Sequence, residues 1–430
     1  MAEAANHPRS VGRSVSRWTL VLAVALVLRL VAAFAVTRYA ESRGKPCVFG
    51  DTAIYRELGR AIAEGDPYFV EQWGTPHYAL RTPGYPLFLA GCRLAFGDDQ
   101  LVARLAQAAL GTLAVWLAAR LAASVLGQDG PVPLVAAAIA AVDPYIVAMS
   151  ALLLSEATFL PLMLLGLWGL ASLWREPGPK RAWLVAAGTG LAMGLAILSR
   201  PSWALFVPLA LMVWVVGSKG EARRSAVRGA LVVALATAAV MAPWWVRNAR
   251  VVGRFVPTAL WIGASLYDGI GPQATGASDM AFVDEPDVRS LGEVEQDQVF
   301  RARSIAFARA NPGRVLGLAL VKLGRFWSPW PNADTLKAPG VAAASALVTL
   351  PVLLLIALGA WQARRDLRAL TLLLGPLLYF CGLHLVFVSS IRYRIPGEVP
   401  ALGLAGLGLT RAWGWFEARR SAGPRPREAC

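Results

Sequence analysis

The strongest constraint on the fold of this chain is a series of apolar segments, each about long enough to cross a lipid bilayer. A transmembrane helix needs about 20 predominantly apolar residues. Segments of roughly this length lie at 18–37, 101–125, 132–149, 156–174, 183–199, 202–217, 229–246, 341–362, 369–389 and 396–415. The 430-residue sequence therefore predicts an all-α polytopic membrane protein with about ten transmembrane helices.

The charge of the chain fits the same class. Only 16% of the residues are charged, whereas about a quarter are charged in an ordinary soluble domain. The net charge of +15 does not indicate nucleic acid, because the cations collect in short loops between apolar segments. These cations are Arg9, Arg13, Arg17, Arg175, Lys180, Arg181, Lys219, Arg223, Arg224, Arg228, Arg364, Arg365, Arg368, Arg419, Arg420, Arg425 and Arg427. The positive-inside rule assigns them to the cytoplasmic face.

This topology leaves both termini in the cytoplasm and two long segments outside, 38–100 and 247–340. We divide the chain into an N-terminal transmembrane module (1–246), which contains the first external loop, the external segment 247–340, and C-terminal helices with a cytoplasmic tail (341–430). A bacterial-type inner (plasma) membrane is the expected location, with the external segments facing the periplasm.

The first external loop predicts two short helices at the membrane surface. Residues 54–62 place their apolar side chains on one helical face, as an interfacial helix does. The apolar stretch Leu87–Phe96 is too short to span and is expected to be interfacial or re-entrant. Cys47 and Cys92 lie in the same loop, where a disulfide and two free thiols both fit the sequence.

The cytoplasmic loops limit the chemistry of the chain. Each has about a dozen residues or fewer, so none houses a nucleotide-binding domain, and no Walker or Rossmann fingerprint appears. This argues against ATP-driven transport by this chain alone. It also argues against a nucleotide-activated substrate held in a soluble catalytic domain.

Two carboxylates on the external face are candidate catalytic groups. Asp51 follows Gly50 and precedes a predicted helix, so it fits a helix cap and also a base that accepts a proton from a hydroxyl. Glu156 stands at the external start of the fourth span. It fits a first-turn residue favoured by the helix dipole, and it also fits a functional carboxylate near membrane depth.

Several arginines lie at the external ends of spans, where they fit either phosphate binding or contact with lipid headgroups. They are Arg81, Arg200, Arg247, Arg392 and Arg394. Arg29 lies inside the first span and therefore needs an internal partner. A role in helix packing and a functional role fit this residue equally well.

The metal signals are weak. His77 and His384 are isolated, and an isolated histidine is more often a structural residue than a ligand. The acidic group Asp284, Glu285 and Asp287 fits a solvated turn better than a metal site. We assign no metal ligand and no certain cofactor; a divalent metal stays open as an alternative but is not indicated.

Six short motifs carry a resemblance to a known family. They are Gly50-Asp51-Thr52-Ala53-Ile54-Tyr55, Arg81-Thr82-Pro83-Gly84-Tyr85-Pro86-Leu87, Leu154-Ser155-Glu156, Leu198-Ser199-Arg200-Pro201, Pro243-Trp244-Trp245-Val246-Arg247-Asn248 and Arg392-Tyr393-Arg394-Ile395-Pro396. In this order the sequence resembles the GT-C membrane glycosyltransferases of the glycosyltransferase 39 type. That group includes protein O-mannosyltransferases, aminoarabinose transferases acting on lipid A, and related enzymes that modify lipopolysaccharide.

The resemblance implies transfer of a sugar from a polyprenyl-phosphate donor to a lipid, glycan or protein hydroxyl on the non-cytoplasmic face, with inversion. Asp51 would be the base and Glu156 the second acidic residue. Arg81 stands where the family often has lysine, which preserves a phosphate-binding role. Arg392, Arg394, Arg200 and Arg247 are further candidates for the phosphate, and Tyr55, His77, Tyr85 and Tyr393 for the substrate lining.

Two other classes of protein remain open from the sequence. A transporter or flippase of lipid-linked sugars would use the same arginines to hold phosphate without any transfer chemistry. A non-catalytic membrane scaffold would need none of these residues. Asp51 discriminates between them, because only a transferase needs a base.

Overall fold

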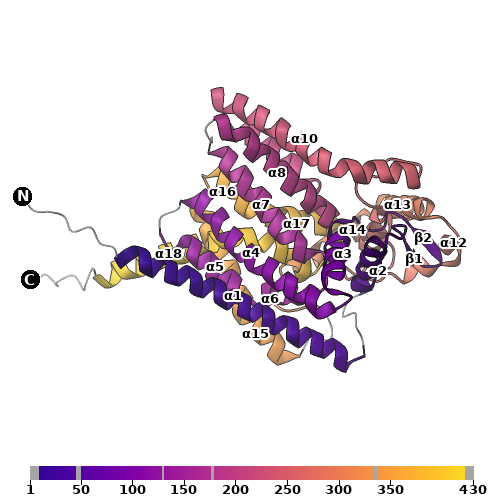
Figure 1. Ribbon diagram of the computed structural model, residues 1–430, viewed down its shortest axis with the longest axis horizontal. Coiled ribbons are helices and arrows are strands. Elements are labelled where there is room, and N and C mark those ends of the chain that lie inside the picture. The colour runs from indigo at the N-terminus through magenta and orange to yellow at the C-terminus, as the bar shows by residue number, and fades with distance from the viewer. Residues whose placement is uncertain (1–8, 45–49, 128–129, 176–178, 333–337, 422–430) are drawn as a thin grey trace, which may run out of the picture.

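The computed structural model describes residues 9–44, 50–127, 130–175, 179–332 and 338–421. Within these ranges the chain is almost entirely helical, with one small sheet (Figure 1). Cys47 lies outside them, so its pairing with Cys92 stays untested, and Arg425 and Arg427 lie outside them as well.

Seven helices in the described part of the chain are long and apolar enough to cross a membrane. They are α1 (Arg9–Ser42, from Arg17), α4 (Gln100–Leu126), α7 (Glu156–Trp174), α8 (Pro179–Ser199, from Arg181), α10 (Gly220–Val251), α15 (Pro339–Gln362) and the span Leu367–Val386. The last comprises α16 (Leu367–Ala369), a π-helical turn η4 (Leu370–Leu374) and α17 (Gly375–Val386). A polytopic all-α membrane protein is therefore confirmed.

The other three predicted spans form different structures. Segment 132–149 is α5 (Val132–Val142) and α6 (Pro144–Ala151), bent by 58° at Asp143, and the pair makes an eighth span if it is one broken helix. Segment 202–217 is a 3-10 turn η1 (Pro201–Trp203) followed by the short helix α9 (Phe206–Gly217). Segment 396–415 lies in α18 (Ile391–Ser421), whose first half is buried among α15, α17, α4 and α5.

Arg29 stabilises the break between α5 and α6. Its guanidinium is fully buried and donates to the carbonyl oxygens of Ala140 at 2.9 Å and Ala141 at 3.2 Å. A helix end leaves such carbonyls without partners. Across the break, the Asp143 carboxylate accepts from the N–H groups of Tyr145 and Ile146, which caps α6. The buried arginine of the first span therefore has a packing role.

The two segments that the sequence predicts to be external, called the external segments below, form one layer at the end of the bundle opposite the first turns of α1 and the last turns of α18 (Figure 1). The first contributes α2 (Gly50–Glu64), β1 (Val70–Gln72), β2 (Thr75–His77) and α3 (Gly84–Phe96). The second contributes α11 (Ile262–Ile270), η2 (Ala281–Asp284), α12 (Pro286–Arg289), α13 (Glu293–Ala310) and α14 (Pro312–Phe326). The predicted interfacial helices are thus α2 and α3.

Glu293 joins the two segments. Its buried carboxylate accepts hydrogen bonds from the backbone N–H groups of Tyr78 at 2.9 Å and Ala79 at 3.0 Å. Burial raises the pKa of Glu293 from 4.5 to about 7, although those two bonds oppose the change. Next to it, the ring nitrogens of His77 lie 2.9 Å from the Thr75 carbonyl oxygen and 3.2 Å from Gln296 Oε1.

We expect Glu293→Gln to change the pH dependence of stability. A carboxyl whose pKa is raised by folding stabilises the fold fully below pH 4.5, and this contribution is lost as the pH rises through 7. Relative to the variant, the wild type should lose at most about 3 kcal/mol of unfolding free energy between pH 5 and pH 8. Thermal unfolding in detergent at both pH values measures this, and parallel curves for the two proteins would contradict it.

Candidate active site

Asp51 lies in the first turn of α2, where its carboxylate meets two arginines. Oδ1 accepts from Nη2 of Arg81 at 2.9 Å, and Oδ2 lies 3.3 Å from Nη1 of Arg392. The Asp51 side chain is 31% exposed, so substrate can reach it. Burial alone would raise the pKa of Asp51, but Arg81 and Arg392 outweigh it and hold the pKa below its usual range. Asp51 is therefore ionised at neutral pH.

Glu156 begins α7 and is buried, with 3% of its side chain exposed. Its Oε1 lies 2.7 Å from Nη1 of Arg200 and 2.7 Å from Nε of Arg392. A buried carboxylate of this kind requires paired charges and hydrogen bonds. Arg392 thus bridges the two carboxylates, with a short bond to Glu156 and longer contacts of 3.3 and 3.4 Å to Asp51.

We call the group Asp51, Arg81, Glu156, Arg200 and Arg392 the carboxylate–arginine cluster. Its members come from α2, the loop before α3, the start of α7, the end of α8 and the start of α18. These elements meet where the external layer joins the membrane helices. With two carboxylates and three arginines the cluster is cationic, as an anion-binding site requires.

α4 fixes the turn that precedes Glu156. The Gln107 side chain donates to the carbonyl oxygen of Leu152 at 2.8 Å, and Arg104 donates to that of Ala151 at 3.2 Å. The Thr52 hydroxyl of α2 donates to the Leu153 carbonyl at 3.1 Å, which ties the Asp51 turn to the Glu156 turn. Sequence reasoning missed Arg104 and Gln107, although polar residues three apart in an apolar span are a signal for an internal partner.

Gly84 brings the Arg81 loop against the end of α8. A Cβ at this position would lie 2.6 Å from the backbone of Leu198 and Ser199, a distance that side-chain carbons do not tolerate. The absence of a side chain therefore lets the loop carrying Arg81 approach the residue before Arg200.

Gly84→Ala should separate these two parts of the cluster. Because the clash is with backbone atoms, α3 or α8 has to move, and we expect any activity that depends on the cluster to fall at least about tenfold, since small displacements of positioned groups cost this much or more. Gly91→Ala is the matched control, because Gly91 is on the same helix with no atom within 4 Å of an added Cβ. Equal activity of both variants would show that the contact is unimportant.

Tyr393 is an aromatic residue that contacts two arginines of the cluster. The guanidinium carbons of Arg200 and Arg392 lie 5.5 and 5.7 Å from its ring centroid. His384 stacks on the same ring, with centroids 4.2 Å apart and planes at 11°. Tyr55 and Tyr85 make an edge contact at 5.0 Å in the core beneath α2. Both side chains are buried, so they belong to the core next to the cluster.

Arg394 lies away from the cluster. Its guanidinium is 1% exposed, pairs with Glu398 at 2.8 Å and donates to the carbonyl oxygens of Phe326 and Ser328. We therefore leave Arg394 out of the phosphate site. His77 is likewise buried between β2 and α13, not at the cluster.

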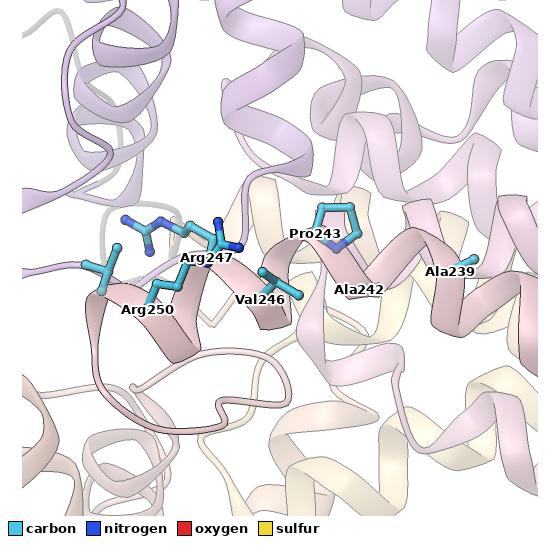
Figure 2. A pocket seen from close by; sticks show the side chains of 7 residues that line it. Ala239, Ala242, Pro243, Val246, Arg247 and Arg250 are labelled. Atoms are coloured by element: carbon cyan, nitrogen blue, oxygen red, sulfur yellow. The ribbon is translucent and has the colours of Figure 1, made fainter.

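Arg247 lies near the C-terminal end of α10, beside an open groove of about 510 Å³ whose lining residues all belong to this helix. Figure 2 shows Arg247 and Arg250 at one end of this groove and Val246, Pro243, Ala242 and Ala239 along it. The Arg247 guanidinium donates to the backbone carbonyls of Tyr68 and Tyr78, and the Tyr68 hydroxyl donates to the Arg81 carbonyl at 3.0 Å. One residue, Tyr68, therefore separates Arg247 from the Arg81 loop.

Among the described residues, no three His, Cys, Asp or Glu side chains are arranged to hold a metal ion. Within the acidic group at 284–287, Glu285 pairs with Arg303 at 2.8 Å and Asp287 pairs with the same arginine.

The helix bundle has the GT-C fold found in membrane glycosyltransferases. Residues 80–246 match the family model of the dolichyl-phosphate-mannose-protein mannosyltransferases. The resemblance to GT-C glycosyltransferases that the sequence motifs indicated is therefore confirmed. No curated protein sequence matches the chain significantly.

Solved structures resemble the chain at low sequence identity. The oligosaccharyltransferase AglB from Archaeoglobus fulgidus, in complex with an inhibitory peptide and a dolichol-phosphate, superposes with a TM-score of 0.58 at 14% identity. The match covers 96% of this chain and 52% of AglB, so the chain spans about half the length of that protein. ArnT from Cupriavidus metallidurans, bound to undecaprenyl phosphate, matches with a TM-score of 0.44 at 18% identity, over 97% of this chain and 82% of ArnT.

Proposed function

We propose that the chain transfers a sugar from a polyprenyl-phosphate donor to a lipid, glycan or protein hydroxyl on the external face of a bacterial-type inner membrane. The observation that carries this proposal is the carboxylate–arginine cluster, which sets an ionised, partly exposed carboxylate beside cationic groups. The basic loops at the other end of the spans support the external location. The dolichol-phosphate bound by AglB supports the class of donor.

In the proposed reaction the acceptor oxygen attacks the anomeric carbon and forms the new glycosidic bond. Its proton passes to the Asp51 carboxylate. The bond between the anomeric carbon and the phosphate oxygen breaks, and polyprenyl phosphate leaves with the electron pair. Arg81 and Arg392 stabilise the charge that develops on the phosphate. Direct displacement inverts the anomeric centre, and the phosphate leaves without a general acid.

Donor binding also makes Asp51 a better base. Without donor, both Asp51 oxygens contact arginines, which lowers the pKa of this carboxyl. A phosphate competes for Arg81 and for the loosely held end of Arg392, whose short bond to Glu156 keeps it in place. As Asp51 loses these partners its pKa rises and one oxygen becomes free for the acceptor hydroxyl. The base is thus available only when donor is present.

The groove along α10 suits the polyprenyl chain of the donor. Its lining is apolar except for Arg247 and Arg250 at the external end, which suits a lipid tail with a phosphate head. Arg247 lies one residue, Tyr68, from the Arg81 loop. The tail would occupy the groove while the phosphate reaches the cluster.

The test uses protein purified in detergent and mixed with a pool of undecaprenyl-phosphate sugars and a panel of membrane-lipid, glycan and peptide acceptors. The expected result is release of undecaprenyl phosphate that depends on both donor and acceptor. If no combination releases it, while the same protein moves lipid-linked sugar across a vesicle membrane, the chain is a transporter and the proposed chemistry is wrong.

A further inference from the structure

The hairpin between β1 and β2 contains a backbone conformation that a tryptophan rarely adopts. Gln72 pairs with Thr75, so Trp73 and Gly74 form a two-residue turn. Both have positive φ, 52° at Trp73 and 77° at Gly74, and Trp73 is the only non-glycine residue with positive φ in the described part of the chain. Glycine or asparagine is favoured at the first of these positions. Strain of this kind persists where the surrounding structure requires it, often at functional sites.

The contacts of Trp73 lead to the cluster. Its indole stacks on that of Trp261, with ring centroids 4.6 Å apart and planes at 9°. The guanidinium carbon of Arg81 lies 5.8 Å from the centroid of the Trp261 ring. Arg81 in turn donates to Asp51 at 2.9 Å. A continuous series of contacts therefore runs from the strained turn through Trp261 to Arg81.

Trp261 belongs to the second external segment, and its backbone is held on both sides. The N–H of Leu260 donates to the Ala79 carbonyl at 2.9 Å, and the N–H of Gly263 donates to Asp297 Oδ1 at 2.6 Å. A Cβ on Gly263 would lie 2.0 Å from the Asp297 carbonyl oxygen, so α11 packs here against α13 without a gap. The Trp261 ring is thus held in place beside the Arg81 guanidinium.

We infer that Trp261, braced by Trp73, is a positioning residue that orients the Arg81 guanidinium toward Asp51 and the donor phosphate. The inference rests on the proposed function. An arginine side chain has many rotamers, and a cation over an indole ring is attracted to its face. The contact with the Trp261 ring restricts the Arg81 side chain before the donor arrives, so Arg81 loses less conformational entropy when the donor binds. The second external segment therefore contributes to donor affinity without touching the donor.

The test compares two ligands that differ only in the head group, undecaprenyl phosphate and undecaprenol, by native mass spectrometry of the full-length protein. Trp261→Leu should raise the Kd for undecaprenyl phosphate about tenfold and leave the Kd for undecaprenol unchanged. Trp261→Phe keeps an aromatic face and should restore most of the loss. Trp73→Asn suits the turn but removes the stack, so it should show the same phosphate-selective loss. Trp330→Leu is the control, an exposed tryptophan of the same external segment, and should bind both ligands like the wild type.

Equal weakening of both ligands by Trp261→Leu and Trp73→Asn would show a general structural role and overturn the inference. Unchanged affinity for undecaprenyl phosphate in both variants would also overturn the inference. The proposed function would still stand in that case if the wild type bound undecaprenyl phosphate more tightly than undecaprenol. A wild type that bound undecaprenol as tightly as undecaprenyl phosphate would overturn the proposed function itself, and the inference with it.

Discussion

Asp51→Asn is expected to lower sugar transfer by a factor of about 10² to 10⁴, the contribution of a positioned general base. The amide has the shape of the carboxylate but does not take the hydroxyl proton. It also removes the anion that Arg81 and Arg392 contact. Both arginines are then free for phosphate, so the affinity for undecaprenyl phosphate should stay the same or increase. The rate of undecaprenyl phosphate release and its Kd measure the two effects.

Slower transfer together with unchanged or higher affinity for undecaprenyl phosphate distinguishes a general base from a residue that acts only through its charge. Asp98→Asn is the matched control, because Asp98 is an external aspartate that pairs with Arg56 and Arg93 at the surface, away from the cluster. It should leave both release and affinity unchanged. If Asp51→Asn transferred sugar at the wild-type rate, Asp51 would not be the base.

The sequence predicted much of the cluster, because topology and motifs constrain its members. Asp51 and Arg81 lie in the first predicted external loop, and Glu156, Arg200 and Arg392 lie at the predicted external ends of spans. The structure brings these five residues into one network of contacts. Their catalytic roles remain predictions, but their proximity is a property of the fold.

Arg394 shows where local pattern fails. From the sequence, Arg392 and Arg394 form a pair between an apolar span and Pro396. In the structure α18 begins at Ile391, so both arginines are helical. Residues two apart on a helix do not face each other. One guanidinium therefore reaches the cluster while the other is buried against Glu398.

The contact between Trp73 and Trp261 could not be predicted from the sequence, for a different reason. Trp73 and Trp261 are far apart along the chain, and their stacking depends on how the two external segments pack. A positive φ at Trp73 is a property of the turn that no side-chain pattern reveals. The apolar segment 132–149 also contains a 58° bend at Asp143, which Arg29 and the Asp143 cap stabilise. Here the following Pro144 is a local signal for a helix boundary.

Arg392→Gln is expected to have the second large effect, on both stability and transfer. It leaves the buried Glu156 with Arg200 as its remaining cluster arginine, so the loss of unfolding free energy should stay below the about 3–5 kcal/mol that an unpaired buried charge costs. It also removes a cation from the proposed leaving-group site, which should lower transfer by a factor of about 10² to 10³. Thermal unfolding and undecaprenyl phosphate release measure the two losses.

The triple variant Glu156→Gln with Arg200→Gln and Arg392→Gln separates these losses. It removes Glu156 together with both arginines that pair with it at 2.7 Å, so no unpaired charge of this group stays buried, and most of the stability should return. Transfer should not return, since the phosphate still lacks its cation. The control is the pair Arg394→Gln with Glu398→Gln, two residues further along α18, where both partners of a buried pair are removed away from the cluster. That protein should transfer sugar at close to the wild-type rate, whereas recovery of transfer by the triple variant would show that Arg392 acts only by holding Glu156.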